Sequence, residues 1–177
     1  MIKINLYSDG ACSPNPGKGG WGAILQYEDG STQELSLGYI STTNNRMELL
    51  GVINPLNFLV DKRSSLESYE IQIFSDSKYV VDAFNKGWLK KWVENNWRKS
   101  DDKPVLNQDL WEKLWGLMSV FNLKFNWVKG HGSNQFNIRC DELAVAARSL
   151  NGDLVEDLNY KKEIPKEKTP LFDIFEE

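Results

Sequence analysis

The sequence pattern over about the first 40 residues predicts three β-strands joined by turns. This pattern limits the chain to folds that contain an antiparallel sheet. Ile2, Ile4 and Leu6 alternate with polar residues, the period of two that is typical of a strand with one apolar face. Glycine and proline recur through residues 12–20 and predict a loop, and Asp29-Gly30 predicts a hairpin turn. We therefore expect strands over residues 2–8, 21–27 and 32–39.

Helices and two further strands follow. Thr42-Thr43-Asn44-Asn45 offers N-caps for a helix, and Pro55 should kink or interrupt that helix. We also predict a strand over 70–75, a helix over 77–85, a helix over 110–121, a strand over 123–128, a loop over 129–137 and a helix over 139–150. This order predicts an α/β fold: a five-stranded mixed sheet, three antiparallel strands plus two parallel, flanked by helices. The strands that begin at residues 2 and 70 should be parallel neighbours.

Length and composition restrict the class of protein. The 177 residues, 41% hydrophobic and 26% charged, fit one domain, which we place at residues 1–150. Two cysteines and one histidine are too few for a tetrahedral zinc site. No apolar run is long enough to span a bilayer, and the first residues do not resemble a signal peptide. We expect a cytoplasmic monomer with free thiols and no membrane association.

The charge is unevenly distributed. The net charge of −4 arises within residues 150–177, which hold eight acids and four bases, so the rest of the chain is neutral. Residues 86–103 hold six bases against three acids. A local basic surface is therefore compatible with an acidic isoelectric point. The bases are Lys86, Lys90, Lys91, Arg98, Lys99 and Lys103.

Two strand ends share a similar sequence, Tyr7-Ser8-Asp9-Gly10 and Phe74-Ser75-Asp76-Ser77. If these strands are adjacent and parallel, Asp9 and Asp76 meet at the edge of the sheet where open α/β folds bind ligands. The alternative is that each aspartate only begins a turn or caps a helix.

Two further carboxylates strengthen the case for a site. Glu48 follows the helix start, where its structural alternative is a capping box with Asn45, and Asp141 should lie in the first turn of the last helix, favourably placed on the helix dipole. Four converging carboxylates repel one another unless cations neutralise them. Oxygen ligands of this kind favour Mg²⁺ or Mn²⁺.

Several motifs together resemble type 1 ribonuclease H over about residues 1–150. They are Asp9-Gly10, residues 17–22, Thr42-Thr43-Asn44-Asn45-Arg46-Met47-Glu48-Leu49, Ser75-Asp76-Ser77, Trp127-Val128-Lys129-Gly130-His131 and Arg139-Cys140-Asp141-Glu142-Leu143-Ala144. The resemblance implies endonucleolytic hydrolysis of the RNA strand of an RNA·DNA hybrid, with 5′-phosphate and 3′-hydroxyl products.

The resemblance also implies residue roles. Asp9, Glu48, Asp76 and Asp141 would hold two Mg²⁺ ions, for which Mn²⁺ would substitute, with Asp9 bridging them. Asp141 would serve the ion that activates water, and Glu48 and Asp76 the ion facing the leaving oxygen. His131 would transfer a proton or assist product release, although a histidine in such a loop is otherwise explained as solvent-facing.

Substrate contacts follow from the same resemblance. Asn15, Asn44 and Asn45 would contact the minor groove of the hybrid, although turn and cap chemistry also explains asparagines there. Thr43 would bind a phosphate of the DNA strand at the helix N-terminus. Three further expected contacts are Cys12, Lys78 and Asn137, of which Lys78 replaces an amide that is common in the family and should contact a phosphate.

The basic segment over residues 86–103 resembles the substrate-binding handle of the family. Its expected contacts are Lys90, Lys91, Trp92, Arg98 and Lys99. Trp88 and Trp92 lie four residues apart, and core packing is the plainer explanation for both. Residues 93–95 are less basic than is usual, so we expect weaker hybrid binding with a smaller dependence on salt.

Two other classes of protein are compatible with these residues. The chain could be a non-catalytic hybrid-binding module, or a nuclease of the same architecture such as a transposase or resolvase domain.

Two segments differ from the core of the family. Residues 61–68 resemble an inserted loop. We expect residues 151–177 to form an acidic extension that is mobile or docks, and its apolar cluster over 171–175 either folds back or binds a replication protein.

Overall fold

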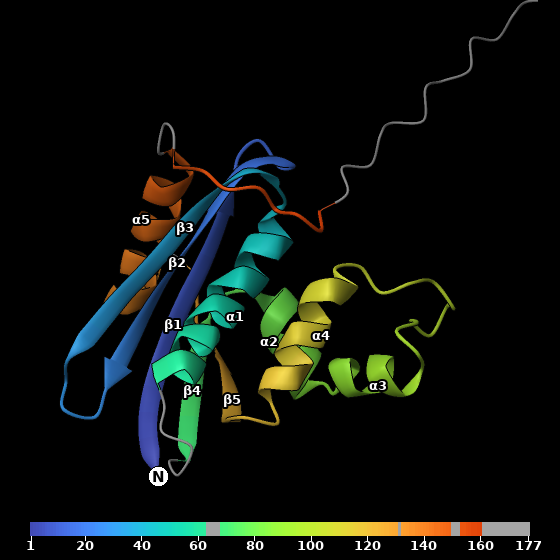
Figure 1. Cartoon of the computed structure of the whole chain (residues 1–177), viewed down its shortest axis with the longest axis horizontal. Coiled ribbons are helices and arrows are strands. Elements are labelled where there is room, and N and C mark those ends of the chain that lie inside the picture. The colour runs from blue at the N-terminus through green and yellow to red at the C-terminus, as the bar shows by residue number, and fades with distance from the viewer. Residues whose placement is uncertain (63–67, 131, 150–152, 161–177) are drawn as a thin grey trace, which may run out of the picture.

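The computed structural model describes residues 1–62, 68–130, 132–149 and 153–160. One mixed sheet runs through the molecule with the strand order β3-β2-β1-β4-β5 (Figure 1). β1 pairs antiparallel with β2 and parallel with β4, so the predicted fold class and the parallel neighbours are confirmed. The strands are β1 (Ile2–Cys12), β2 (Gly17–Tyr27), β3 (Thr32–Thr42), β4 (Tyr69–Ser75) and β5 (Asn122–Trp127).

Helices cover both faces of the sheet. α5 packs on β1, β2 and β3 from one side, and α1 packs on β1 and β2 from the other and contacts α2 and α4. Figure 1 shows α1 in front of the sheet and α5 behind it. The helices are α1 (Asn44–Lys62), α2 (Lys78–Asn85), α3 (Trp88–Glu94), α4 (Gln108–Leu117) and α5 (Gln135–Ser149).

The alternation along β1 divides the core between these two faces. Ile4 and Leu6 are buried in the main core on the α1 side, whereas Tyr7 joins a smaller cluster that contains Ile24 and Cys140. Successive side chains of a strand point to opposite faces, so one strand anchors both layers. β1 is therefore a rigid base for the residues at its carboxyl end.

The loop predicted over residues 12–20 is wrong, because residues 17–20 belong to β2 and only residues 13–16 connect the strands. Gly20 explains the error. A Cβ at Gly20 would collide with the carbonyl oxygen of Ala144 in α5, so glycine is required here for close packing rather than for a turn. The third strand likewise continues to Thr42, three residues beyond its predicted end.

Two helix predictions also need correction. Pro55 lies inside α1 without interrupting it, and the neighbouring Ile53 and Leu56 are buried, so packing outweighs the lost hydrogen bond. The last helix begins at Gln135, not at residue 139, because the Asn134 side chain accepts hydrogen bonds from the backbone N–H groups of Phe136 and Asn137.

A segment beyond α5 lies against the sheet. The backbone of Val155 accepts a hydrogen bond from Ile40 at 3.0 Å and donates one to Gly38 at 3.0 Å. The apolar cluster predicted over 171–175 and most of the loop predicted over 61–68 lie outside the described residues. Among the described helices, none combines the length and the apolar character that a membrane crossing requires.

Candidate active site

Three carboxylates from separate parts of the chain meet at the carboxyl end of the parallel strands. Asp9 lies on β1, Asp76 follows the last residue of β4, and Glu48 lies on the second turn of α1. One oxygen from each of the three lies within 4.8 Å of the others. The parallel pairing of β1 with β4 ends at Tyr7 and Phe74, two residues before each aspartate, which is why the two side chains arrive together.

Close packing of α1 on β1 brings Glu48 to this pair. A Cβ at Gly10 would lie 2.5 Å from the backbone nitrogen of Glu48, so the helix could not approach a larger residue this closely. Glu48 does not form the capping box with Asn45 that is the structural alternative to a role as a ligand. Thr43 caps α1 instead, since its Oγ1 accepts a hydrogen bond from the Arg46 N–H at 3.4 Å.

The carboxylates are buried, with Asp9 only 7% and Glu48 only 6% exposed. The Gly10 N–H donates to Asp9 Oδ1 at 2.8 Å, and Asn44 Nδ2 donates to Glu48 Oε1 at 3.3 Å. Glu48 Oε2 is buried and has no hydrogen-bond partner among the described residues. A buried carboxylate oxygen without a partner is costly, and a bound cation would satisfy it.

Burial and mutual repulsion shift the titration of this cluster. Desolvation, with the charges of Asp76 and Asp141 in addition, raises the pKa of Asp9 from 3.8 to about 7. Desolvation and the charges of Asp9 and Asp76 raise the pKa of Glu48 well above its usual range. A divalent cation would reverse both effects, because it favours the ionised carboxylates. The cluster of Asp9, Glu48 and Asp76 therefore has the donor chemistry of a divalent metal site.

Asp141 lies near the cluster but is not part of its closest group. It is in the second turn of α5, not in the first turn as predicted, because the helix begins four residues earlier. Its side chain is half-buried, and its charge contributes to the raised pKa of Asp9. His131 lies outside the described residues, so its role stays a prediction.

The residues predicted to contact substrate near α1 also have structural roles. Asn15 Oδ1 accepts a hydrogen bond from the Asn44 N–H at 3.1 Å, and this ties the β1–β2 loop to the start of the helix. The Cys12 thiol donates to carbonyl oxygens of the same region, including Pro14 at 3.3 Å. Asn45 is exposed, whereas Asn137 is buried with its Oδ1 unpartnered within the described part of the chain.

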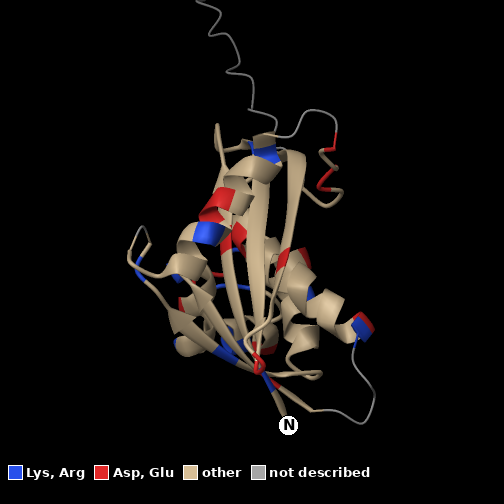
Figure 2. Cartoon of the chain, turned by 90° about the vertical axis from the view of Figure 1, so that its left-hand side faces the viewer, with Lys and Arg blue, Asp and Glu red and all other residues tan. Residues whose placement is uncertain are grey.

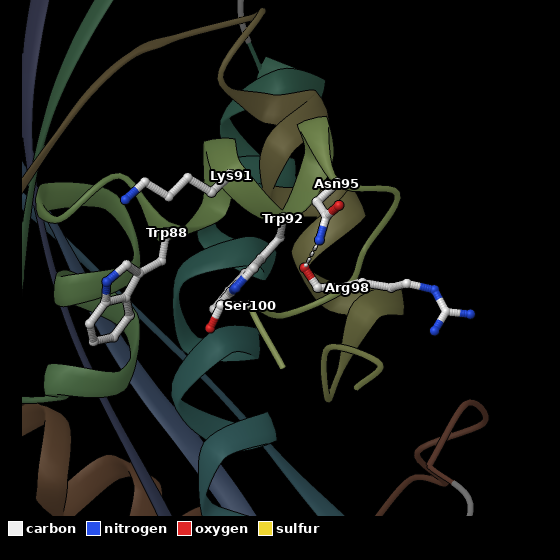
Figure 3. Close-up of a pocket in the computed structure, with 6 residues that line it drawn as sticks. All are labelled: Trp88, Lys91, Trp92, Asn95, Arg98 and Ser100. Atoms are coloured by element: carbon white, nitrogen blue, oxygen red, sulfur yellow. Dashed lines mark hydrogen bonds between the residues drawn. The ribbon is translucent and has the colours of Figure 1, made fainter. Parts of the chain in front are cut away.

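The basic segment over residues 86–103 surrounds a cavity of about 300 Å³ (Figure 3). The cavity is lined by Trp88, Lys91, Trp92, Asn95, Arg98 and Ser100. Figure 3 shows the Lys91 side chain extending over the Trp88 side of the cavity, while the Arg98 guanidinium points away from it. Trp92 packs against buried Trp111 as predicted, but Trp88 is exposed, so core packing explains only one of the two.

Acidic neighbours partly neutralise this basic segment. Lys86 pairs with Asp82 at 2.7 Å, Lys90 with Glu94 at 3.8 Å and Lys103 with Asp101 at 2.9 Å. Figure 2 shows acidic and basic residues interspersed along the ribbon rather than gathered in one block. These pairs favour a small dependence of hybrid binding on salt, because bases that are already paired release fewer counterions from the nucleic acid.

Two features of the site region were missed by sequence reasoning. Trp127 was noted only as part of a motif, yet it is exposed beside Asp76 at the end of β5. Arg46 is buried and bonded to Asp109 and Asp157. Trp127 was missed because the alternation of Leu123, Phe125 and Trp127 along the strand favours a buried indole. The Arg46 contacts were missed because no local sequence signal connects Asp157 with Arg46.

The fold and the site define an α/β protein with an acidic centre, suited to a metal ion, at the carboxyl ends of parallel strands. The family profile of RNase H matches residues 2–149. Ribonuclease HI of Synechocystis sp. is 47% identical over 154 residues, which cover 87% of this chain and 92% of that protein. The chain belongs to the ribonuclease H family, in its type 1 branch, as the resemblance predicted.

Solved structures of ribonucleases H have the same fold as this chain. The crystal structure of LC9-RNase H1, described as a type 1 RNase H with the type 2 active-site motif, superposes with a TM-score of 0.72 at 25% identity, covering 84% of this chain and 72% of that one. The crystal structure of LC11-RNase H1 in complex with an RNA/DNA hybrid gives a TM-score of 0.64 at 26% identity, covering 81% and 95%.

Proposed function

We propose that this ribonuclease H hydrolyses the RNA strand of RNA·DNA hybrids endonucleolytically, using two divalent ions and leaving 5′-phosphate and 3′-hydroxyl ends. The observation that carries the proposal is the cluster of buried Asp9 and Glu48 with half-buried Asp76, in which one oxygen of each lies within 4.8 Å of the others. Membership of the ribonuclease H family, and the hybrid bound to LC11-RNase H1, support the substrate.

The residues present fit a pair of hard cations. Asp9, Glu48 and Asp76 would hold them together with Asp141, and Glu48 Oε2 supplies an oxygen that has no other partner in the described structure. Bound Mg²⁺, or Mn²⁺ in its place, supplies activated water and stabilises the charge that develops in the transition state.

The side chains around the cluster orient these oxygens. Gly10 N–H and Asn44 Nδ2 each hold one oxygen of Asp9 and Glu48, which leaves the other oxygen of each for a ligand. Asn44 thereby connects the metal site with the predicted minor-groove contacts Asn15 and Asn45. His131 we assign to proton transfer or product release.

Binding of the hybrid uses two regions in this proposal. The N-terminus of α1, with Thr43 at its cap, receives a phosphate of the DNA strand. The basic segment over residues 86–103 adds phosphate contacts through Lys90, Lys91, Arg98 and Lys99. Since four of its bases, Arg98 among them, already pair with acids, we expect a shallow salt dependence.

The alternatives make different predictions. A non-catalytic hybrid-binding module would not need a cluster of like charges around two buried carboxylates, which costs stability and favours cation binding. A transposase or resolvase domain would cut duplex DNA. The relative from Synechocystis sp. is a ribonuclease HI and is matched over 92% of its length, which favours the ribonuclease.

The decisive experiment offers end-labelled RNA·DNA hybrid, duplex RNA and duplex DNA to the purified chain, with Mg²⁺, with Mn²⁺ or with a chelator. We expect cuts in the RNA strand of the hybrid alone, and only when a divalent ion is present. Cutting that survives chelation would contradict the metal mechanism, and cutting of duplex DNA would favour the other nucleases.

A matched pair of variants assigns the activity to the cluster. Asp9→Asn should lower the cleavage rate by more than about 100-fold, above the range typical of losing an outer partner of a metal ligand. Glu28→Gln removes an equal charge in the β2–β3 turn, at the opposite end of β1, and should cleave like wild type. Full turnover by Asp9→Asn would favour the non-catalytic module.

The remaining predictions concern the assembly. We propose a cytoplasmic monomer, and we propose that residues 165–177 either fold back or bind a replication protein. Deleting residues 165–177 separates these two outcomes: loss of partner capture with unchanged stability supports binding, and lowered stability supports folding back.

A further inference from the structure

Trp127 is an exposed indole in a position where strand alternation predicts burial. Leu123 and Phe125 occupy the same face of β5, and Phe125 is buried against Phe84 of α2 with a ring separation of 3.7 Å. Trp127 is 48% exposed. It lies two residues further along the strand than Phe125, and Lys78, the first residue of α2, places its ammonium over the ring.

Two contacts hold this indole in place. Its Nε1–H donates a hydrogen bond to the carbonyl oxygen of Asp76 at 3.1 Å. The ammonium of Lys78 lies over the ring, 5.3 Å from its centroid. Trp127 thus contacts both the backbone of a carboxylate in the cluster and a cation two residues further on.

The second contact gives the Lys78 side chain a defined position. An exposed lysine normally samples many rotamers, and a cation–π contact of this kind contributes about 0.5–1 kcal/mol toward one of them. The ammonium is thereby placed at the rim of an acidic cluster that repels phosphates. A cation fixed at that rim offsets the repulsion for a backbone phosphate that approaches the site.

We propose that Trp127 is a positioning residue that holds Lys78 as a preformed phosphate-binding subsite for the hybrid, and that fixes the backbone of Asp76 at the same time. The inference rests on the proposed function and adds a residue to it. Its chemical requirement is a nucleic-acid backbone phosphate beside the bond that is cut.

The test measures log(kcat/KM) for hybrid cleavage against log[salt]. Lys78→Gln should reduce the steepness of this dependence by about 0.7–0.9, the value of one phosphate contact. Trp127→Leu should give a similar reduction although it removes no charge. The double variant should resemble either single variant, because both changes disable one subsite.

Three further variants make the result specific. Trp127→Phe keeps a ring for Lys78 but loses the N–H, so it should retain the salt dependence while kcat falls a few-fold. Lys78→Arg should restore the wild-type dependence. Lys62→Gln removes a cation that lies 5.5 Å from the ring of Phe58, at the far end of α1, and should change nothing.

The outcomes separate the inference from the function on which it rests. A wild-type protein that does not cut the hybrid refutes the proposed function. If the wild type cuts but Trp127→Leu keeps the wild-type salt dependence, or if the Lys78 and Trp127 effects add in the double variant, the inference alone is refuted. Thermal unfolding of each variant identifies any general loss of folding. If Trp127→Leu or Lys78→Gln is destabilised, the salt dependences of Trp127→Phe and Lys78→Arg test the inference in their place.

Discussion

Two buried charged clusters begin two residues apart on α1 and are built in opposite ways. Glu48 points into the cluster with Asp9 and Asp76, where every charge has the same sign. Arg46 is 3% exposed and lies between Asp109 and Asp157, so each charge meets an opposite one. The same turn of helix therefore supports one cluster of like charges and one in which opposite charges pair.

The Arg46 cluster satisfies its hydrogen bonds internally. Arg46 donates to Asp109 at 2.9 and 2.8 Å and to Asp157 at 2.6 and 2.8 Å, and Thr42 Oγ1 also donates to Asp157. Burial raises the pKa of Asp109, but the hydrogen bonds from Arg46 and its positive charge together outweigh burial, so the pKa of this carboxyl stays below its usual range. Such a network stabilises the fold without an added ligand.

The contrast teaches which cluster serves stability and which serves chemistry. A buried pair with complete hydrogen bonding needs nothing further, whereas a buried group of like charges becomes favourable only when a cation binds.

The Arg46 cluster should be costly to break. Arg46→Met leaves Asp109 and Asp157 without their shared cation, and Asp157 is only 5% exposed, so we expect a loss of about 3–5 kcal/mol of unfolding free energy. Denaturant unfolding at neutral pH measures it. A loss below about 1 kcal/mol would mean that the two clusters do not differ as described.

The carboxylate cluster should make the metal-free protein less stable as the pH rises. The pKa of Asp9 is raised from 3.8 to about 7, so the folded state binds the extra proton and its advantage is lost between these two values. We expect Asp9→Asn to remove a decline on the order of 4 kcal/mol across this window, since one pKa unit corresponds to about 1.4 kcal/mol.

Denaturant midpoints in chelator, from about pH 4 to above pH 7, give this difference between the two proteins. Glu48 retains its own raised pKa, so part of the slope should remain in the variant. If wild type and Asp9→Asn lost stability equally as the pH rises, folding would not raise the pKa of Asp9, and this prediction would be contradicted.

An exposed ion pair provides the smallest effect and the control for Arg46. Arg139 pairs with Glu34 and Glu142 on the surface, with 47% of its side chain accessible. Arg139→Met should lower the unfolding free energy by less than about 1 kcal/mol, because water screens such pairs. The same denaturant experiment measures this loss. A loss equal to that of Arg46→Met would show that burial does not determine how much these ion pairs stabilise the fold.

Much of the fold was predictable because its signals are local. The period of two in β1, the Asp-Gly turn before β3 and the repeated strand ends at Asp9 and Asp76 each lie within a few residues of sequence. These signals, together with the family motifs, predicted the sheet and the meeting of the aspartates.

The errors arose where packing between distant segments decides the local structure. The sequence predicts a loop at Gly20, because glycine is common in turns. Glycine is needed there for another reason: the backbone of α5 packs too closely for a side chain. Pro55 was expected to interrupt a helix that burial of its neighbours keeps continuous. The bond between Arg46 and Asp157 joins residues separated by 111 positions, and no periodicity or motif connects them.

The most direct test of the central claim follows thermal unfolding of wild type and Asp9→Asn above pH 7, first in chelator and then with increasing Mg²⁺. The account predicts that the variant is the more stable protein in chelator, and that Mg²⁺ raises the midpoint of the wild type well above that of the variant. A wild type that is more stable than Asp9→Asn without metal, or that does not respond to Mg²⁺, would contradict it.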